Sequence, residues 1–308
     1  MLWTSRAKEA NMNKISQYYK EIYSETSSFQ NLFDSEFINY NSREDKHWNF
    51  IFKDELKKFL FSNEISSKDV NLENLHNEIG QEYFSFNTIG QQNNSRPKIS
   101  DIGFDFILQK ESLYHDFLRW VRKKIIKKNF YFQKTPTIRF HVPGIEKRLS
   151  LPAWHSDSFF GHSPKEINFW FGLTDNKHSD FWMNSLQDSE KWFQEYSYDR
   201  EAWKNICFSN DSDFIKKGFI NAFEVCDIYD NLAIFDSRCI HTVDYRSERD
   251  PTTKITIDMR IILVDDYEWL LVEERPIFVG DGIKKAEFRP GSKYGYHKKS
   301  IDEIMFDK

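Results

Sequence analysis

Two patterns of hydrophobic and polar residues divide the sequence near residue 130. Before that point, apolar residues recur at helical spacing, as in ISQYYKEIYSETSSF, FKDELKKFLF and DVNLENLHNEIGQEYF. The clearest case is residues 111–128, where an apolar residue returns every four positions, at Leu113, Phe117, Val121 and Ile125. We therefore expect an N-terminal annex made mostly of helices.

From residue 135 onward the apolar residues come in short runs that are rich in β-branched or aromatic side chains and are separated by polar turns. These runs are TPTIRFHV, INFWFGL, FWMNSL, NAFEVCDI, NLAIFDS and ITIDMRIILV. Helices followed by many short strands indicate an α+β protein with an antiparallel β core. A jelly roll is the closure that such a set of strands favours.

No Pro/Gly/Ser-rich linker separates these parts, and the polar stretch QQNNSRPKISD at 91–101 reads as a loop. We expect one domain over 1–308, with a helical annex over 1–130, a jelly-roll core over 135–270 and a C-terminal extension over 271–308. Aromatic residues make up 17% of the chain, including 29 Phe, which allows few residues to fill a core.

Composition and charge narrow the function classes. A mean hydropathy of -0.69 with 30% charged residues, no long apolar run and no signal-peptide pattern predicts a soluble protein without a membrane span. The net charge of -5 argues against a nucleic-acid partner. Three cysteines, Cys207, Cys226 and Cys239, form no CxxC pair, which favours reduced thiols in the cytoplasm. The sequence says nothing of the oligomeric state.

Basic residues gather at the end of the helix predicted over 111–128, at Arg119, Arg122, Lys123, Lys124, Lys127 and Lys128. The simple interpretation is a solvated helix end, where cations interact favourably with the helix dipole. The alternative is a site for a phosphate-bearing substrate.

Two histidines and one acid form a candidate metal site. His155 and Asp157 flank one residue, so in an extended segment their side chains point the same way. His241 ends the run NLAIFDSRCIH, 84 residues beyond Asp157 (241 minus 157), and would come from another strand. Two imidazoles and one carboxylate leave three positions open on an octahedral ion, which suits non-haem Fe(II) with a bidentate co-substrate and O2.

The same tripeptide recurs as His178-Ser179-Asp180, and spacing alone does not choose between the copies. The second copy lies in the polar connection TDNKHSD, where we expect side chains to face water. The first is flanked by apolar and aromatic residues, as a strand end that opens into a cavity would be, so we assign the site to His155 and Asp157. His241 taken alone could equally be a strand-end histidine that a neighbour satisfies.

An arginine follows on the strand ITIDMRIILV. Alternation places Arg260 with Thr256 and Asp258 on one face, opposite the apolar residues. A guanidinium inside a barrel is always charged and requires an anion to balance it. Its planar fork binds a carboxylate bidentately. The alternative is a pairing of Arg260 with Asp258 or another acid.

These features together resemble the Fe(II)/2-oxoglutarate oxygenase superfamily. The segments IRFHVPG (138–144), WHSDSFFGHSPKEINFW (154–170), NSL (184–186) and LAIFDSRCIH (232–241) look like its phytanoyl-CoA-hydroxylase-like branch, and within it the streptomycin-biosynthesis-type oxygenases of sporadic carbohydrate clusters. The likeness covers roughly residues 135–290, and residues 1–130 carry no family signal.

The resemblance implies a double-stranded β-helix in which His155, Asp157 and His241 ligate iron and Arg260 binds the far carboxylate of 2-oxoglutarate. Arg260 follows His241 by 19 residues (260 minus 241), which is longer than in many relatives, so Arg246 and Arg249 are alternatives. By the same resemblance, we expect Asn168 to be a further donor to the co-substrate. Expected substrate or neighbouring contacts are Arg139, His162, Asn184 and Arg238, and the expected aromatic lining is Trp154, Phe159, Phe160, Phe169 and Trp170.

The implied reaction is oxidation of a C–H bond of a small polar molecule, with O2 as co-substrate and with succinate and CO2 formed from 2-oxoglutarate. Because related halogenases lack the carboxylate ligand, Asp157 favours hydroxylation, desaturation or ring closure. The implied substrate is a sugar, amino-sugar or nucleotide-sugar, and an amino-acid-derived precursor is the alternative. A jelly-roll binding protein with zinc or no metal, and a cupin-like isomerase or hydrolase that needs no O2, are rival interpretations.

Overall fold

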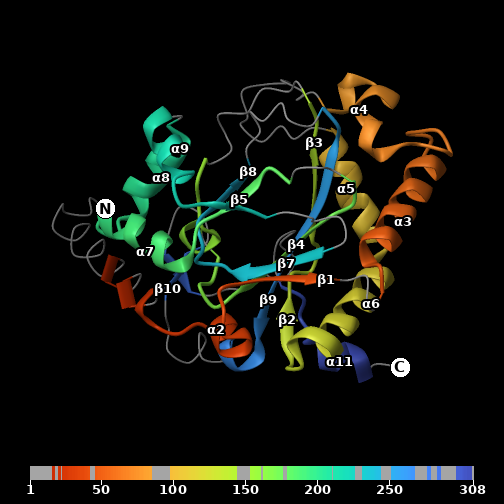
Figure 1. The fold of residues 1–308 in the computed structure, drawn as a ribbon. Helices are drawn as coiled ribbons and strands as arrows, with labels where there is room; N and C mark the ends of the chain where they lie inside the picture. Colours follow the sequence, from red (N-terminus) through yellow and green to blue (C-terminus); the bar gives the residue numbers. More distant parts are fainter. Residues whose placement is uncertain are drawn as a thin grey trace, which may run out of the picture.

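The computed structural model describes most of the chain (Figure 1), namely residues 16–17, 20–21, 23–41, 46–84, 98–143, 153–160, 162–175, 179–209, 211–225, 231–243, 251–267, 276–278, 283–285 and 296–306. Its α-helices are α2 (Ser28–Phe33), α3 (Trp48–Ser62), α4 (Leu75–Glu78), α5 (Lys98–Gln109), α6 (Glu111–Val121), α7 (Leu186–Glu195), α8 (Arg200–Phe208), α9 (Ser212–Gly218) and α11 (Ile301–Phe306). A π-turn, η4 (Arg122–Ile126), and the 3-10 turns η2 (Leu72–Asn74), η3 (Gln81–Tyr83) and η5 (Asp157–Phe160) complete the helical elements.

The larger of two main sheets has six strands, all paired antiparallel. Its order is β1 (Phe37–Asn41), β7 (Asn231–Asp236), β4 (Ile167–Gly172), β9 (Lys254–Leu263) and β2 (Phe130–Phe132), and β3 (Thr137–His141) pairs with β9 beside β2. The register sets Asn168 of β4 opposite Arg260 of β9. Two polar residues of the predicted site are therefore cross-strand neighbours.

The smaller sheet has the order β6 (Phe223–Glu224), β5 (Phe181–Met183) and β8 (His241–Val243). An antiparallel bridge between His155 and His241 adds the segment before Asp157 to the β8 edge. From β3 onward, successive strands alternate between the sheets. The strands β3, β4, β7 and β9 belong to the larger sheet, and the His155 segment, the pair β5 and β6, and β8 follow the first three of them in turn in the smaller sheet. This alternation is the jelly-roll path of a double-stranded β-helix, so the predicted α+β fold class is confirmed. A separate hairpin joins β10 (Pro276–Phe278) and β11 (Ile283–Lys285).

Helices of the annex cover the outer face of the larger sheet (Figure 1). Alternate residues of β9 enter the core beneath them, namely Ile255, Ile257, Met259, Ile261 and Leu263. Phe52 of α3 contacts Phe171 of β4 at 5.7 Å between ring centroids. Because one face of β9 is buried here, its other face, which carries Asp258 and Arg260, points into the barrel.

The helix predicted over 111–128 is present with a modified end. Regular α-helix stops at Val121, the π-turn continues to Ile126, and Lys127 ends it in the left-handed region at φ 55. The annex also holds β1, which the helical interpretation of residues 1–130 missed. The strand FINYN finds its place only by pairing with β7, 198 residues later in the chain (235 minus 37 for the pair Phe37 and Phe235).

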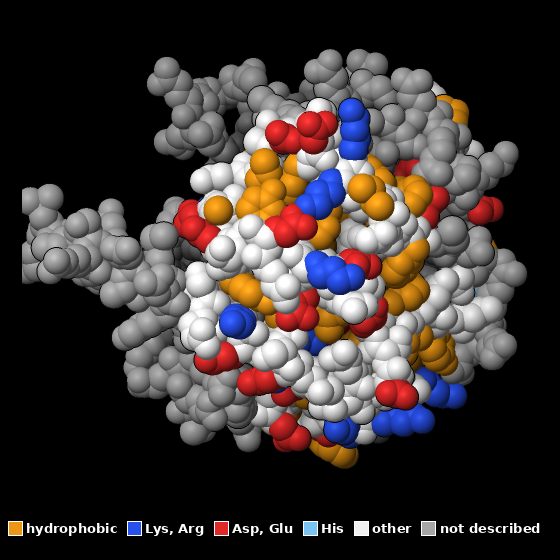
Figure 2. Space-filling model, turned by 60° about the vertical axis from the view of Figure 1, so that its left-hand side comes forward, with side chains coloured by type: hydrophobic (Ala, Val, Ile, Leu, Met, Phe, Trp, Pro, Cys, Tyr) orange, Lys and Arg blue, Asp and Glu red, His pale blue; other side chains and the backbone are white. Residues whose placement is uncertain are grey.

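Three helices between β5 and β6, α7 to α9, were also missed. Each begins at a residue whose side chain accepts backbone N–H groups of the first turn: Ser185, Asp199 and Asp211. They enclose a second aromatic core around Trp154, Trp192 and Trp203. The molecule is turned in Figure 2 to bring the side with these helices forward, and the described part of that face mixes acidic and basic side chains rather than gathering one charge.

Among the described helices, none has the length and apolar character that a bilayer crossing requires. Cys207 and Cys239 are buried free thiols, and Cys226 lies outside the described residues.

Candidate metal centre

His155 and His241 are held side by side by the backbone. The His155 N–H donates to the His241 carbonyl at 3.0 Å and the His241 N–H donates to the His155 carbonyl at 2.8 Å. In this antiparallel pair both side chains project from the same face, and the ring centroids are 4.5 Å apart. Asp157 follows at the start of η5. One ligand atom from each of the three residues lies within 4.8 Å of the others.

Hydrogen bonds orient the ligand atoms of two residues, His241 and Asp157, toward this cluster. The Nδ1 of His241 lies 3.0 Å from the Cys239 carbonyl, which can only accept, so Nδ1 donates and Nε2 keeps its lone pair for the cluster. The Asp157 carboxylate accepts from Asn168 Nδ2 at 2.8 Å and from Arg260 Nε at 3.0 Å. Both bonds end on Oδ2, and the Arg260 Nη2 contact at 2.9 Å does too, which leaves Oδ1 available for an ion.

Burial and charge set the protonation of the three groups. Burial lowers the pKa of both His155 and His241, so each imidazole is neutral and able to ligate. Burial would raise the pKa of Asp157, but the Arg260 guanidinium outweighs it and holds that pKa far below its usual range. Two neutral nitrogens and a carboxylate form the donor set that a non-haem ferrous ion takes, so the residues present fit this metal.

The cluster lies on a pocket with a volume of about 240 Å³. Its lining includes the predicted residues Arg139, His162, Asn168, Phe169, Trp170 and Arg260, and also Phe181, Phe235, Val243, Asp258 and Met259. Alternation along NLAIFDS could have placed Phe235 inside the barrel, whereas Phe181 is brought there only by sheet pairing. A volume slightly below the usual range for drug-sized ligands suits a small molecule.

Arg260 is 11% exposed at its side chain and lies among three carboxylates. Its guanidinium is paired with Asp157. Its Nε lies 3.9 Å from Glu166 Oε2, and its Nη2 lies 4.0 Å from Asp258 Oδ2. Arg139 binds Asp258 with Nε at 3.2 Å and Nη2 at 2.7 Å. The alternative drawn from the sequence, an acid partner for Arg260, is therefore present, although the principal acid is Asp157 rather than Asp258.

Other predicted contacts lie elsewhere. Asn184 is buried and donates to the Gly218 carbonyl at 3.2 Å, which ties β5 to α9 rather than facing the pocket. Trp154 is in the second aromatic core and donates to the Ile215 carbonyl at 3.0 Å. The side chains of Phe159 and Phe160, and all of Arg246 and Arg249, lie outside the described residues.

Arg238 is likewise structural. It is 1% exposed, and its Nε and Nη2 each donate a hydrogen bond of 2.9 Å to the Asp236 carboxylate. Replacing Arg238 with methionine would leave the Asp236 carboxylate buried without its cation, and we expect a loss of about 3–5 kcal/mol in the free energy of unfolding, measured by urea denaturation. Arg119→Ala, which breaks an exposed pair with Asp116, is the control and should cost less than about 1 kcal/mol. Equal losses would contradict this role.

The repeated tripeptide does not form a site in the described residues. Asp180 is 3% exposed and forms an ion pair with Lys254, so the expectation that it faces water was wrong. His178 lies outside the described residues. The sequence reasoning missed Lys254 as the partner because the pair joins two segments 74 residues apart.

Comparisons with known proteins give limited matches. No family model matches the chain. A segment of 44 residues is 41% identical to the streptomycin biosynthesis protein StrG of Streptomyces griseus, covering 14% of this chain and 21% of that protein. The chain thus matches about a fifth of the length of that relative.

Solved structures similar to the chain include a nickel complex of the non-heme monooxygenase ThoJ, which is 12% identical with a TM-score of 0.37 over 77% of each chain. The non-heme α-ketoglutarate-dependent carbocyclase SnoK from nogalamycin biosynthesis is 8% identical with a TM-score of 0.37, over 89% of this chain and 97% of that one. EctD from S. alaskensis is 10% identical with a TM-score of 0.38 over 78% of each chain. A jelly roll that brings two imidazoles and one carboxylate to one pocket suits a non-haem ferrous ion.

Proposed function

We propose that this chain is an Fe(II)/2-oxoglutarate-dependent oxygenase that oxidises a C–H bond of a small polar metabolite. The observation that carries the proposal is the convergence of His155, Asp157 and His241 from separate segments of a jelly roll on one buried pocket. Iron with 2-oxoglutarate and O2 would supply the oxidising chemistry when bound. The residues of the chain hold the metal, orient the co-substrate and keep the pocket dry.

Formal charge supports this assignment of ligands. With the histidines neutral, Arg139 and Arg260 face three carboxylates in and beside the pocket, those of Asp157, Asp258 and Glu166. A divalent metal would leave this buried site with a net positive charge, which is costly. A carboxylate of the co-substrate offsets that charge, and Arg260 offers it a planar fork beside the metal ligands. We therefore assign the far carboxylate of 2-oxoglutarate to Arg260.

The substrate is proposed to be rich in hydroxyl or amino groups, as a sugar, amino-sugar or nucleotide-sugar is. Within the described part of the chain, Asp258 Oδ1 and Asn168 Oδ1 are buried acceptors without a hydrogen-bond partner, and Thr256 Oγ1 on the same face of β9 is a third buried polar atom without one. An unmet buried acceptor costs about 1–3 kcal/mol, which a donor on a ligand can recover. The co-substrate has only acceptors, so these atoms favour a donor-rich substrate. The segment shared with a streptomycin biosynthesis protein supports a biosynthetic role.

The substrate class is tested by succinate release from 2-oxoglutarate in the presence of Fe(II) and O2. Sugars, amino-sugars and nucleotide-sugars are compared with amino-acid-derived compounds of similar size. We expect a member of the first group to raise succinate release above the rate without substrate, with one succinate formed per oxidised product. Stimulation by the amino-acid-derived group alone would overturn the proposed substrate class but would still support the oxygenase chemistry. The absence of succinate under every condition would overturn both the substrate class and the oxygenase chemistry.

Asp258 gives a further prediction. Asp258→Asn keeps the shape of the side chain but removes its charge and one acceptor, so the substrate KM should rise about tenfold, as the loss of roughly 1.4 kcal/mol implies. The KM for 2-oxoglutarate should change by much less. A rise confined to the 2-oxoglutarate KM would show that Asp258 acts on the co-substrate side instead.

A further inference from the structure

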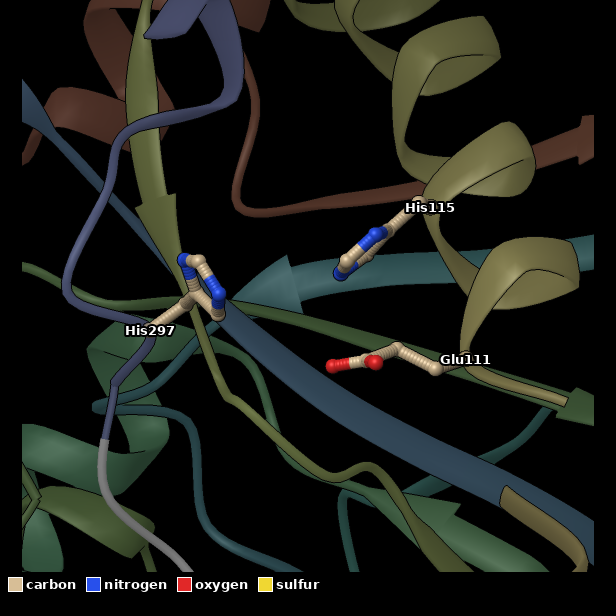
Figure 3. Close-up of side chains that lie close together, drawn as sticks. All are labelled: Glu111, His115 and His297. Carbon is tan, nitrogen blue, oxygen red and sulfur yellow. The ribbon is translucent and has the colours of Figure 1, made fainter. Parts of the chain in front are cut away.

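A second cluster of possible metal ligands lies on the opposite side of β2 from the pocket. Glu111 and His115 come from the first turns of α6, and His297 comes from the segment that precedes α11. The three side chains point toward one another (Figure 3), and one ligand atom from each lies within 4.8 Å of the others. The cluster shares no residue with the His155, Asp157 and His241 site.

The fold presets two of these side chains. Glu111 and His115 are four residues apart, so they lie on the same face of α6, one turn above the other. His297 is fixed by its backbone N–H, which donates to the Phe132 carbonyl of β2 at 2.8 Å, and by its ring, which stacks on Phe132 at 5.0 Å between centroids. The two imidazoles lie edge to face, with 5.7 Å between their centroids.

The nitrogen atoms available to an ion can be identified. The Nδ1 of His297 lies 3.1 Å from the backbone N–H of Lys299, which leaves Nε2 for the cluster. The Nε2 of His115 is buried and has no hydrogen-bond partner among the residues that the structure describes. A buried imidazole nitrogen without a partner costs free energy, and a cation between the two rings would satisfy it.

We propose that Glu111, His115 and His297 bind a zinc-type divalent cation, with water as the fourth ligand. Two imidazoles and one carboxylate are borderline-soft ligands that select zinc over Mg²⁺ or Ca²⁺. Tetrahedral zinc with bonds near 2.0–2.1 Å needs ligand atoms about 3.3 Å apart, so ligand atoms that lie within 4.8 Å of one another must move closer on binding. Glu111 is exposed and its side chain can rotate to close the site.

The position of this site links it to the pocket. Tyr296, next to His297, forms a β-bridge with Gln133 and donates a hydrogen bond to Glu166. Glu166 in turn lies 3.2 Å from His162 Nδ1 and 3.9 Å from Arg260 Nε. An ion that ties His297 to α6 therefore fixes the segment that places Tyr296 beside the residues of the pocket. Its proposed role is to anchor residues 296–306, and this inference does not depend on the proposed oxygenase activity.

Metal stoichiometry tests the binding. Metal-free full-length protein is dialysed against micromolar free zinc, and bound zinc is counted. We expect the wild-type protein to bind two zinc ions per chain, one at each cluster. His115→Ala and the conservative Glu111→Gln should lose the ion of the second cluster and bind one. Asp157→Ala should lose the ion of the pocket cluster and also bind one. His47→Ala, which removes an exposed histidine elsewhere, is the matched control and should keep two. Two ions in His115→Ala, or second-site binding only at millimolar zinc, would overturn the proposal.

Protection of the C-terminal segment tests the anchoring. Lys298 and Lys299 are exposed trypsin sites directly after His297. Zinc should slow cleavage there at least about tenfold in the wild-type protein, because cleavage requires the segment to leave α6. His115→Ala leaves the cleaved sequence unchanged but should abolish the zinc effect, whereas His47→Ala should keep it. Equal cleavage rates with zinc and with chelator in the wild type would show that no ion anchors the segment.

Discussion

Asp157→Ala should lose coupled turnover of 2-oxoglutarate and substrate altogether, with iron affinity lowered by more than about 100-fold. Residues that only support metal ligands cost 10- to 100-fold in affinity, and a direct ligand should cost more. Asp157 also neutralises Arg260, so its loss leaves a buried guanidinium beside the two imidazoles, which further repels a cation. The measurement is iron bound at equilibrium, together with succinate and product formed per minute.

Asp180→Asn is the matched control for this experiment. Asp180 belongs to the second copy of the tripeptide and is paired with Lys254 in a buried contact. Its substitution should lower the free energy of unfolding, by about 3–5 kcal/mol, because the Lys254 ammonium loses its counter-charge. The folded fraction should nonetheless bind iron and turn over as the wild type does. If both variants lost iron to the same degree, the ligand assignment would be wrong.

Arg260→Lys should raise the KM for 2-oxoglutarate by about 30-fold or more. Lysine keeps the charge but not the planar fork, so the bidentate contact with a carboxylate is lost. Removing one partner of a buried charge pair typically costs about 2–5 kcal/mol. The turnover number at saturating 2-oxoglutarate should fall much less, because Arg260 is proposed to bind rather than to react.

Arg139→Lys separates this role from a general effect of positive charge in the pocket. Arg139 lies on the same wall but is paired with Asp258 and is 40% exposed at its side chain. We expect the substrate KM to rise and the 2-oxoglutarate KM to stay within a factor of about three, since a partly exposed pair is weak. The opposite pattern would move the co-substrate to Arg139, and an unchanged KM in both variants would point to Arg246 or Arg249.

The sequence predicted the strands of the core because their hydrophobic pattern is local. Six predicted runs correspond to β3, β4, β5, β6, β7 and β9, and alternation along β9 correctly separated the buried face from the face with Arg260. The pairing partner of each strand is not local, which is why β1 was read as part of a helical annex. Its residues are only half-buried and become a strand by adding to the edge at β7.

The three residues of the metal cluster were selected from the sequence by spacing and context, yet their electrostatic setting was not predictable. The pairing of Arg260 with Asp157 depends on the register that sets β4 against β9, and the sequence pattern contains no information on that register. The cluster of Glu111, His115 and His297 shows the same limit. Helical spacing could suggest the first two residues, but only folding brings His297 to them from the C-terminal segment.

The most direct test of the proposed iron site is the visible spectrum of the protein under anaerobic conditions. Metal-free protein is given one equivalent of Fe(II) and then excess 2-oxoglutarate, and the same is done with Asp157→Ala. We predict a metal-to-ligand charge-transfer band that appears only when both iron and 2-oxoglutarate are present and is absent from Asp157→Ala. A folded wild-type protein that binds iron but shows no such band with saturating 2-oxoglutarate would contradict the proposed function.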